Sequence, residues 1–309
     1  MIGAVDIGGT KIAVGLVDDG GRVVRRAEAP TEAERGYPVG LEKITKMLRG
    51  ALRETGAAIR GIGIGSTGML DPIRGQWLDV DFLPGWEHQS PMEDLSREFG
   101  LRAAMENDGD AGALAEAYWG AGKGKSRMVY VTIGTGIGGG IVLDGYLYRG
   151  VEGSHPEIGH HVMEASGPAC TCGLRGCWET LAAGCSMEKW YMENRPAQDR
   201  KVVTARGICE LARKGDEFAK QAVEREGTYL GLGLANLIGM FVPDVIVLGG
   251  GMMQSADLYL GRIHEVIRGG CRFVPAEKTE IALASLAENA NLIGAAMAWR
   301  HRYEHEAAG

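Results

Sequence analysis

The chain has 309 residues, which is enough for two domains or one large domain. Its 33 Lys and Arg residues against 40 Asp and Glu residues give a net charge of −7, which argues against a general role in binding nucleic acid. Hydrophobic residues make up 45%, and no apolar run approaches the roughly 20 residues of a membrane span. Because the N-terminus shows no secretory signal, we expect a cytoplasmic protein with no membrane partner.

The first segment predicts a β-hairpin, with strands at residues 2–7 and 12–17 around a glycine turn and a third strand at 22–28. Glycines let backbone N–H groups approach phosphate oxygens, Thr adds a hydroxyl and Lys a positive charge, while Asp suits Mg²⁺. A plain hairpin turn is the alternative, since neither a P-loop nor a GxGxxG spacing occurs. The residues of this first phosphate candidate are Asp6, Gly8, Gly9, Thr10 and Lys11.

Further elements are predicted as a helix at 41–55, a strand at 60–64, a helix at 91–99, a strand at 102–106 and a helix at 110–119. Asp81 lies on a Pro-Gly loop and is a candidate for binding sugar hydroxyls. Trp86, on the same loop, could stack on a sugar, although packing in the core is the commoner role of such a residue.

The segment Glu106-Asn-Asp-Gly-Asp110 precedes the predicted helix at 110–119. Either Asp108 or Asp110 could cap that helix by accepting its first free N–H groups, and we favour Asp110. Asp108 would then be free to act as the general base that accepts a hydroxyl proton during phosphoryl transfer. Asn107, Glu157 and Glu179 supply further groups that could bind sugar hydroxyls.

The chain then repeats itself, because residues 128–145 resemble residues 2–20 at an offset of 126. The repeat predicts two related α/β lobes facing each other across a cleft, a natural place for a nucleotide. A helix at 223–241, a buried strand at 245–248 and a terminal helix at 290–303 follow. The second and third phosphate candidates are Thr132, Gly134, Thr135, Gly136, Gly138 and Gly139, and then Gly249, Gly250 and Gly251.

A cluster of possible metal ligands occupies eighteen residues and comprises His160, Cys170, Cys172 and Cys177. One His with three Cys is a common closed set for structural zinc. The alternatives are buried thiols or a disulfide pair, which an intracellular chain disfavours, and the neighbouring His161 could replace His160. The scattered Cys185, Cys209 and Cys271 are predicted to be small core residues, and His155 is predicted to be structural.

Together these segments resemble the ROK (repressor, ORF, kinase) family of sugar kinases over essentially the whole chain. The motifs are DIGGTK at 6–11, STG at 66–68, LPGW at 83–86, ENDGDAGALAE at 106–116, IGTGIGGGI at 133–141, EIGH at 157–160, CTCGLRGCWE at 170–179 and VLGGG at 247–251. The resemblance implies a two-lobed actin-like ATPase fold with duplicated ribonuclease H-like domains, Mg·ATP and often a homodimer. It also implies zinc at His160, Cys170, Cys172 and Cys177, with Asp108 as catalytic base and Asn107, Glu157, His160 and Glu179 lining the sugar site.

Residues 1–118, completed by 290–309, are expected to form the N-terminal lobe, and 119–289 the C-terminal lobe with a zinc-binding segment at 157–179. We expect an ATP-dependent hexose kinase that phosphorylates the 6-hydroxyl, most simply of glucose. The alternatives are an N-acetylmannosamine or N-acetylglucosamine kinase, a fructokinase, or a non-catalytic sugar-sensing regulator. His155 before Pro156 and Glu157 resembles some fructokinase members, whereas the CTCG spacing matches glucokinase and N-acetylhexosamine kinase members better. The helix-turn-helix extension of the family's repressors is not expected, because the phosphate turn begins at Asp6.

Overall fold

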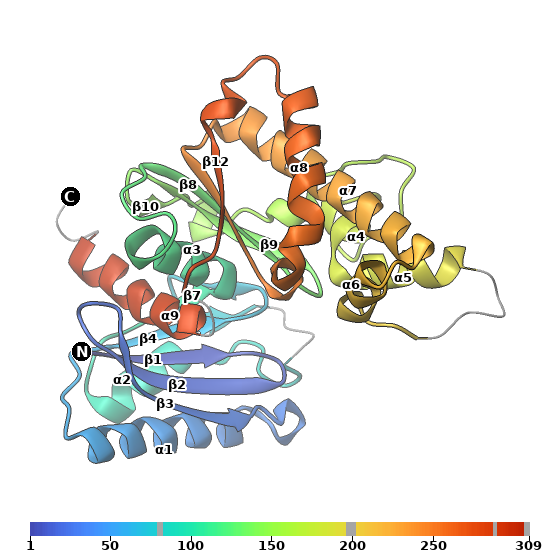
Figure 1. The fold of residues 1–309 in the computed structure, drawn as a ribbon. Helices are drawn as coiled ribbons and strands as arrows, with labels where there is room; N and C mark the ends of the chain where they lie inside the picture. Colours follow the sequence, from blue (N-terminus) through green and yellow to red (C-terminus); the bar gives the residue numbers. More distant parts are fainter. Residues whose placement is uncertain (79–82, 196–201, 287–288, 306–309) are drawn as a thin grey trace. The chain divides into compact units, whose positions relative to one another are not determined.

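The structure is a computed structural model that describes residues 1–78, 83–195, 202–286 and 289–305 (Figure 1). It is a mixed α/β chain that divides into two compact units. Unit 1 comprises Met1–Gly124, Gly140–Pro156 and Ser285–Gly309, and unit 2 comprises Lys125–Gly139 and Glu157–Ala284. The division expected from the sequence falls at residue 118 and leaves the segment 140–156 in the second lobe, whereas its contacts place that segment in unit 1.

The first sheet, in unit 1, has five strands in the order β3-β2-β1-β4-β7. Strands β1, β2 and β3 form the predicted antiparallel meander, and β4 and β7 join β1 in parallel. Their bounds are β1 Ile2–Ile7, β2 Lys11–Val17, β3 Val23–Pro30, β4 Ile62–Ser66 and β7 Ala103–Asn107. The carboxyl ends of the parallel strands β1, β4 and β7 therefore meet at one edge, where an α/β sheet places its ligands.

Alternation along β1 builds two hydrophobic layers, because successive side chains of a strand point to opposite faces. Val5 and Ile7 pack on one face with helix α1, Tyr37–Thr55, which supplies Ile44. Ile2 and Ala4 pack on the other face with helix α9, Ala290–Arg300, and Figure 1 shows the two helices on opposite faces of this sheet.

The contact between α9 and β4 is very close. A Cβ at Gly63 would lie 1.8 Å from the carbonyl oxygen of Ala295, so this position accepts only glycine.

Two more helices and a small hairpin complete the main elements of unit 1: α2 Pro91–Phe99, α3 Asp108–Trp119, β5 Leu70–Asp71 and β6 Gln76–Trp77. Trp86 is fully buried and meets Trp77 and Tyr37 edge-on, with ring centroids 5.3 and 5.4 Å apart. Trp86 is therefore a core residue, as its commoner role suggested. Asp81 lies outside the described residues.

The second sheet has the order β10-β9-β8-β11-β12 and repeats the strand senses of the first. Its hairpin of β8 and β9 corresponds to β1 and β2, and β11 and β12 continue it in parallel as β4 and β7 do in the first sheet. The bounds are β8 Arg127–Ile133, β9 Ile137–Leu143, β10 Tyr146–Leu147, β11 Val245–Gly249 and β12 Glu280–Leu283. The shared order explains why the two sequence segments resemble each other.

The helices of unit 2 are α4 Trp178–Ala182, α5 Gly184–Asn194, α6 Ala205–Arg213, α7 Glu217–Phe241 and α8 Ala256–Gly270. Helix α7 begins six residues before the predicted start because the side chain of Asp216 accepts a hydrogen bond from the Ala219 N–H at 2.8 Å. Short helical turns occupy Ala33–Arg35, Val151–Gly153, Ile158–His160, Gly251–Ser255, Ala276–Lys278 and His301–His305. Within the described ranges, no helix is long and apolar enough to cross a membrane.

The scattered cysteines do not all follow the prediction. Cys209 is buried, as expected, and Cys271 is partly buried. Cys185 is exposed, so the prediction of a core residue is wrong there. It occupies the first turn of α5, and the neighbouring Gly184 is the residue that turns inward, where its N–H donates to the Gly134 carbonyl at 2.8 Å.

Candidate functional site

The first phosphate candidate is a tight turn between β1 and β2. The Gly8 N–H donates to the Lys11 carbonyl at 2.9 Å, and the buried Thr31 hydroxyl donates to the Gly8 carbonyl at 2.7 Å. Thr10 and Lys11 are exposed, and Lys11 forms a surface ion pair with Glu28 at 3.2 Å. The turn is thus supported from inside by Thr31, which the sequence did not reveal, while Thr10 and Lys11 remain exposed.

Asp6 and Asp108 stand at the carboxyl ends of β1 and β7, respectively. Burial raises the pKa of Asp6, and the Asn291 amide, which donates to Asp6 Oδ2 at 3.2 Å, opposes that shift. Burial and then the negative charge of Asp6 raise the pKa of Asp108 to about 6. Two partly dehydrated carboxylates that repel each other fit a divalent cation, because its charge would offset both effects.

The junction of β7 and α3 corrects the predicted helix cap. Asn107, not Asp110, is the N-cap, and its side-chain oxygen accepts the Gly109 N–H at 2.8 Å. The same N–H lies 2.8 Å from Asp108 Oδ1, so Asp108 takes part in this turn. Asp110 is fully buried and ion-pairs with Arg149, which is why it cannot serve as the cap.

A buried charge network surrounds this junction and was missing from the sequence-based site. Arg149 binds Glu106 and Asp110, and His155 Nδ1 lies 4.0 Å from Asp110 Oδ2. Burial raises the pKa of Glu106 to about 7, although Arg149 opposes that shift. Glu106 was visible in the acidic segment before α3, but no spacing in the sequence connects it to Arg149, forty-three residues later.

In unit 2, the second and third phosphate candidates lie at the carboxyl ends of adjacent parallel strands. Thr132 of β8 pairs in register with Gly249 of β11. Gly250 has a φ of +88°, and a Cβ there would lie 2.3 Å from the Ile133 carbonyl oxygen, so the close approach of the two turns requires glycine. Thr135 at the tip of the second turn is exposed.

Glu179 is placed against the second turn. Its Oε2 accepts the Ile137 N–H at 2.9 Å, and a Cβ at Gly136 would lie 2.3 Å from the same oxygen. The predicted sugar-binding acid therefore also shapes the glycine loop, and Gly136 makes room for it.

The four predicted metal ligands converge. The ligand atoms of His160, Cys170, Cys172 and Cys177 all lie within 4.8 Å of one another. Cys170 Sγ is 3.3 Å from His160 Nδ1, and Cys172 Sγ is 3.5 Å from Cys177 Sγ. Tetrahedral zinc with bonds of about 2.3 Å to sulfur separates its sulfur ligands by about 3.7 Å, so the donor set and its spacing fit this ion.

Two alternatives for this cluster lose support. His161 points elsewhere, with Nδ1 2.6 Å from the Ile158 carbonyl oxygen and Nε2 3.1 Å from Met163 Sδ. The three cysteines are free thiols, and the cluster has no disulfide. His160 Nε2, on the other side of the ring from Cys170, lies 4.0 Å from Glu157 Oε2, which connects the cluster to a predicted sugar-binding acid.

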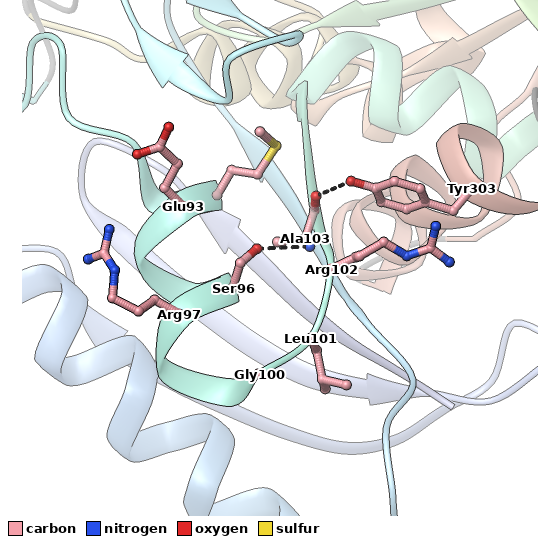
Figure 2. A pocket seen from close by; sticks show the side chains of 9 residues that line it. Glu93, Ser96, Arg97, Gly100, Leu101, Arg102, Ala103 and Tyr303 are labelled. Carbon is pink, nitrogen blue, oxygen red and sulfur yellow. Dashed lines mark hydrogen bonds between the residues drawn. The ribbon is translucent and has the colours of Figure 1, made fainter.

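A cavity of about 480 Å³ in unit 1 is separate from these groups (Figure 2). It lies between α2, the start of β7 and Tyr303, whose hydroxyl donates to the Ala103 carbonyl at 2.9 Å. Because Ala103 begins β7 and Asp108 follows its other end, the cavity is not part of the candidate site.

Similar solved structures define the class of fold. The crystal structure of a ROK hexokinase from Thermus thermophilus is 37% identical and has a TM-score of 0.86, covering 96% of this chain and 97% of that one. The structure of a ROK family glucokinase from Streptomyces griseus in complex with glucose and AMPPNP is 31% identical, with a TM-score of 0.80 and the same coverages. The chain accordingly has the two-lobed actin-like ATPase fold.

The sequence match is specific to one family. The ROK family matches residues 2–302, and a glucokinase from Thermotoga maritima is 30% identical over 308 residues, covering 96% of each chain. The chain belongs to the ROK family.

Proposed function

We propose that this ATP-dependent sugar kinase transfers the γ-phosphate of Mg·ATP to the 6-hydroxyl of a hexose, and that the hexose is glucose. The observation that carries the proposal is Asp108, a carboxylate that follows β7 at the edge of the first sheet where β1 carries Asp6, and whose pKa is raised to about 6. The similarity to proteins named glucokinase, one of them solved in complex with glucose, supports glucose over other hexoses.

Asp108 accepts the proton of the attacking hydroxyl in this mechanism. A base with a pKa near 6 is mostly ionised at neutral pH, yet it is a stronger proton acceptor than an ordinary aspartate. Asp6 would hold Mg²⁺ directly or through water, and the ion would supply charge neutralisation on the phosphates. The turns that contain Gly8, Gly134 and Gly250 bind the phosphates and adenosine through backbone N–H groups other than those of Gly8 and Gly134, which donate within their own turns.

His160, Cys170, Cys172 and Cys177 hold a structural zinc ion in this proposal. Four protein ligands would leave no open coordination position, so the ion would orient residues and take no part in chemistry. Ligation would fix the ring of His160, whose other nitrogen faces Glu157. Asn107, Glu157, His160 and Glu179 bind the sugar hydroxyls, and Asp81 remains a further candidate.

We also propose that the enzyme is a cytoplasmic homodimer. ATP and reducing conditions that keep thiol ligands free favour the cytoplasm, and the family resemblance favours the dimer. Sedimentation equilibrium of the purified protein should give twice the 33.0 kDa chain mass, and a monomer at micromolar concentration would contradict the dimer.

A coupled assay of ADP release tests the function across glucose, fructose, mannose, N-acetylglucosamine and N-acetylmannosamine. We expect the highest kcat/KM with glucose. Fructose in first place would favour the fructokinase alternative, which the sequence His155-Pro156-Glu157 supports, and an N-acetylhexosamine in first place would favour the other alternative. Turnover of none of these sugars would refute the proposed activity.

A further inference from the structure

Arg149 binds two carboxylates, one before and one after Asp108 in the sequence. Its two terminal nitrogens donate to Glu106, two residues before Asp108, and to Asp110, two residues after it. The side chains of Arg149, Glu106 and Asp110 are only 22%, 12% and 1% exposed, so water screens these contacts weakly.

The two carboxylates belong to different elements. Glu106 lies near the end of β7 and Asp110 in the first turn of α3. A planar guanidinium reaches two acceptors at a fixed separation, so Arg149 sets the distance between the strand end and the helix start. Asn107 and Asp108 lie between these two anchors and have little freedom to move independently of them.

Arg149 also restrains the segment that leads to the predicted sugar-binding acid. Residues 150–154 close on themselves, with the Gly150 N–H donating to the Ser154 carbonyl at 2.8 Å. His155, directly after this turn, lies 4.0 Å from the same Asp110 oxygen that Arg149 binds. Asp110 therefore binds Arg149 at the start of the 149–155 segment and lies close to His155 at its end, and Glu157 follows two residues later.

We propose that Arg149 is a positioning residue for phosphoryl transfer, which fixes Asn107 and Asp108 through Glu106 and Asp110 without touching a substrate. The inference rests on the proposed sugar kinase activity and adds a residue to it. A displacement of about 1 Å in a catalytic group can cost about 10²-fold in rate, and this sets the size of the expected effect.

The first test is the steady-state kinetics of Arg149→Met and Arg149→Lys with glucose and ATP. We expect kcat to fall about 10²-fold in Arg149→Met, with the KM for ATP within about threefold of wild type, because Arg149 binds the carboxylates of Glu106 and Asp110 and is none of the residues of the phosphate turns. Arg149→Lys keeps the charge but cannot bridge two carboxylates in one plane, so we expect it to recover part of the lost kcat. A kcat for Arg149→Met within twofold of wild type would overturn the inference.

A compensated variant separates positioning from simple charge balance. Arg149→Met alone leaves two buried carboxylates without their cation, which destabilises the fold. The triple variant Glu106→Gln, Asp110→Asn, Arg149→Met carries no such charges, so we expect its thermal midpoint to return toward that of wild type while kcat stays low. Recovery of kcat together with the midpoint would show that Arg149 only balances charge.

Arg127→Met is the matched control, because it removes an exposed ion pair with Asp244 at the start of β8. We expect wild-type kcat from this control, and an equal loss of kcat in it would overturn the specific role of Arg149. Wild-type enzyme that phosphorylates none of the sugars would refute the proposed function, whereas active wild type with an unaffected Arg149→Met would refute the positioning role alone.

Discussion

Asp108→Asn should make the protein more stable while it removes the activity. The substitution keeps the size of the side chain but takes away a charge that burial and the negative charge of Asp6 disfavour in the folded chain. Enzymes commonly lose some folding stability to keep a catalytic group in the state that activity requires, here an ionised base. Both effects can be measured on the same purified variant.

The magnitude follows from the raised pKa. Asp108 has a pKa of about 6 in the folded state against an ordinary value of 3.8, and each pKa unit corresponds to about 1.4 kcal/mol. Ionised Asp108 therefore costs the folded state about 3 kcal/mol at pH 7 and above. The cost shrinks to roughly half at pH 5 and disappears below pH 3.8, where both states are protonated. The amide of Asn must itself be buried, so we expect a gain of about 1 to 3 kcal/mol at pH 8.

Thermal unfolding at pH 8, 6 and 4.5 measures this gain, and coupled ADP release measures turnover. We expect the stability advantage of Asp108→Asn to be largest at pH 8 and to fade at pH 4.5. We also expect kcat to fall by about 10² to 10⁴ or more. In wild type, the acid limb of kcat/KM should fall below about pH 6, where the base of the free enzyme is protonated.

Asp18→Asn is a control of opposite sign in the same unit. Hydrogen bonds from the backbone and side chain of Arg22 and from the Gly20 N–H lower the pKa of Asp18, so its neutralisation should reduce stability at pH 8. An equal gain from Asp108→Asn at all three pH values would refute the argument from a dehydrated charge. A kcat near that of wild type would refute the role of Asp108 as base.

Three further substitutions test other parts of the structure. Glu226 is fully buried on α7 without a hydrogen-bond partner among the described residues, and burial raises its pKa to about 8. Because this carboxyl ionises at a lower pH in the unfolded chain than in the folded chain, wild type should lose stability as the pH rises from 4.5 to 8. Glu226→Gln should reduce that loss, as measured by thermal unfolding. Cys172→Ser should lower bound zinc well below one equivalent by elemental analysis and weaken glucose binding in calorimetry, whereas a zinc-free variant with normal glucose affinity would break the proposed link between the two. Gly250→Ala places a Cβ 2.3 Å from the Ile133 carbonyl at a φ of +88°, so we expect a loss of about 1 to 3 kcal/mol in stability and a higher KM for ATP, and a wild-type KM would argue against a nucleotide role for this turn.

Local patterns predicted most of the elements because their causes are local. The helix α2 was predicted with both ends correct, since Ser90 caps it and Pro91 begins it. The glycine-containing hairpins at the start of each sheet were visible as a repeat, and the cluster of candidate metal ligands was visible as four residues in a short segment. Each of these signals depends on residues that are close in the chain.

The errors arose where a side chain had competing partners. Asp110 is a good capping residue by type, and its position before the predicted helix favoured that role. In the folded chain Asp110 meets Arg149, a partner thirty-nine residues away, and Asn107 takes the cap instead. Cys185 was predicted from its residue type to be buried, but the inward turn at its neighbour Gly184 leaves it on the surface.

The sequence by itself indicated the family, many of the strands and helices, the glycine turns and Asp108 as the candidate base, because residue type and short spacing carry these signals. Only the tertiary structure decided which charges are paired and which are dehydrated. It placed Asp6 near enough to raise the pKa of Asp108, and it joined Glu106, Arg149 and Asp110 into one network. The physical reason is that electrostatic energies depend on distance and burial in space, and residues far apart in the chain acquire both only when it folds.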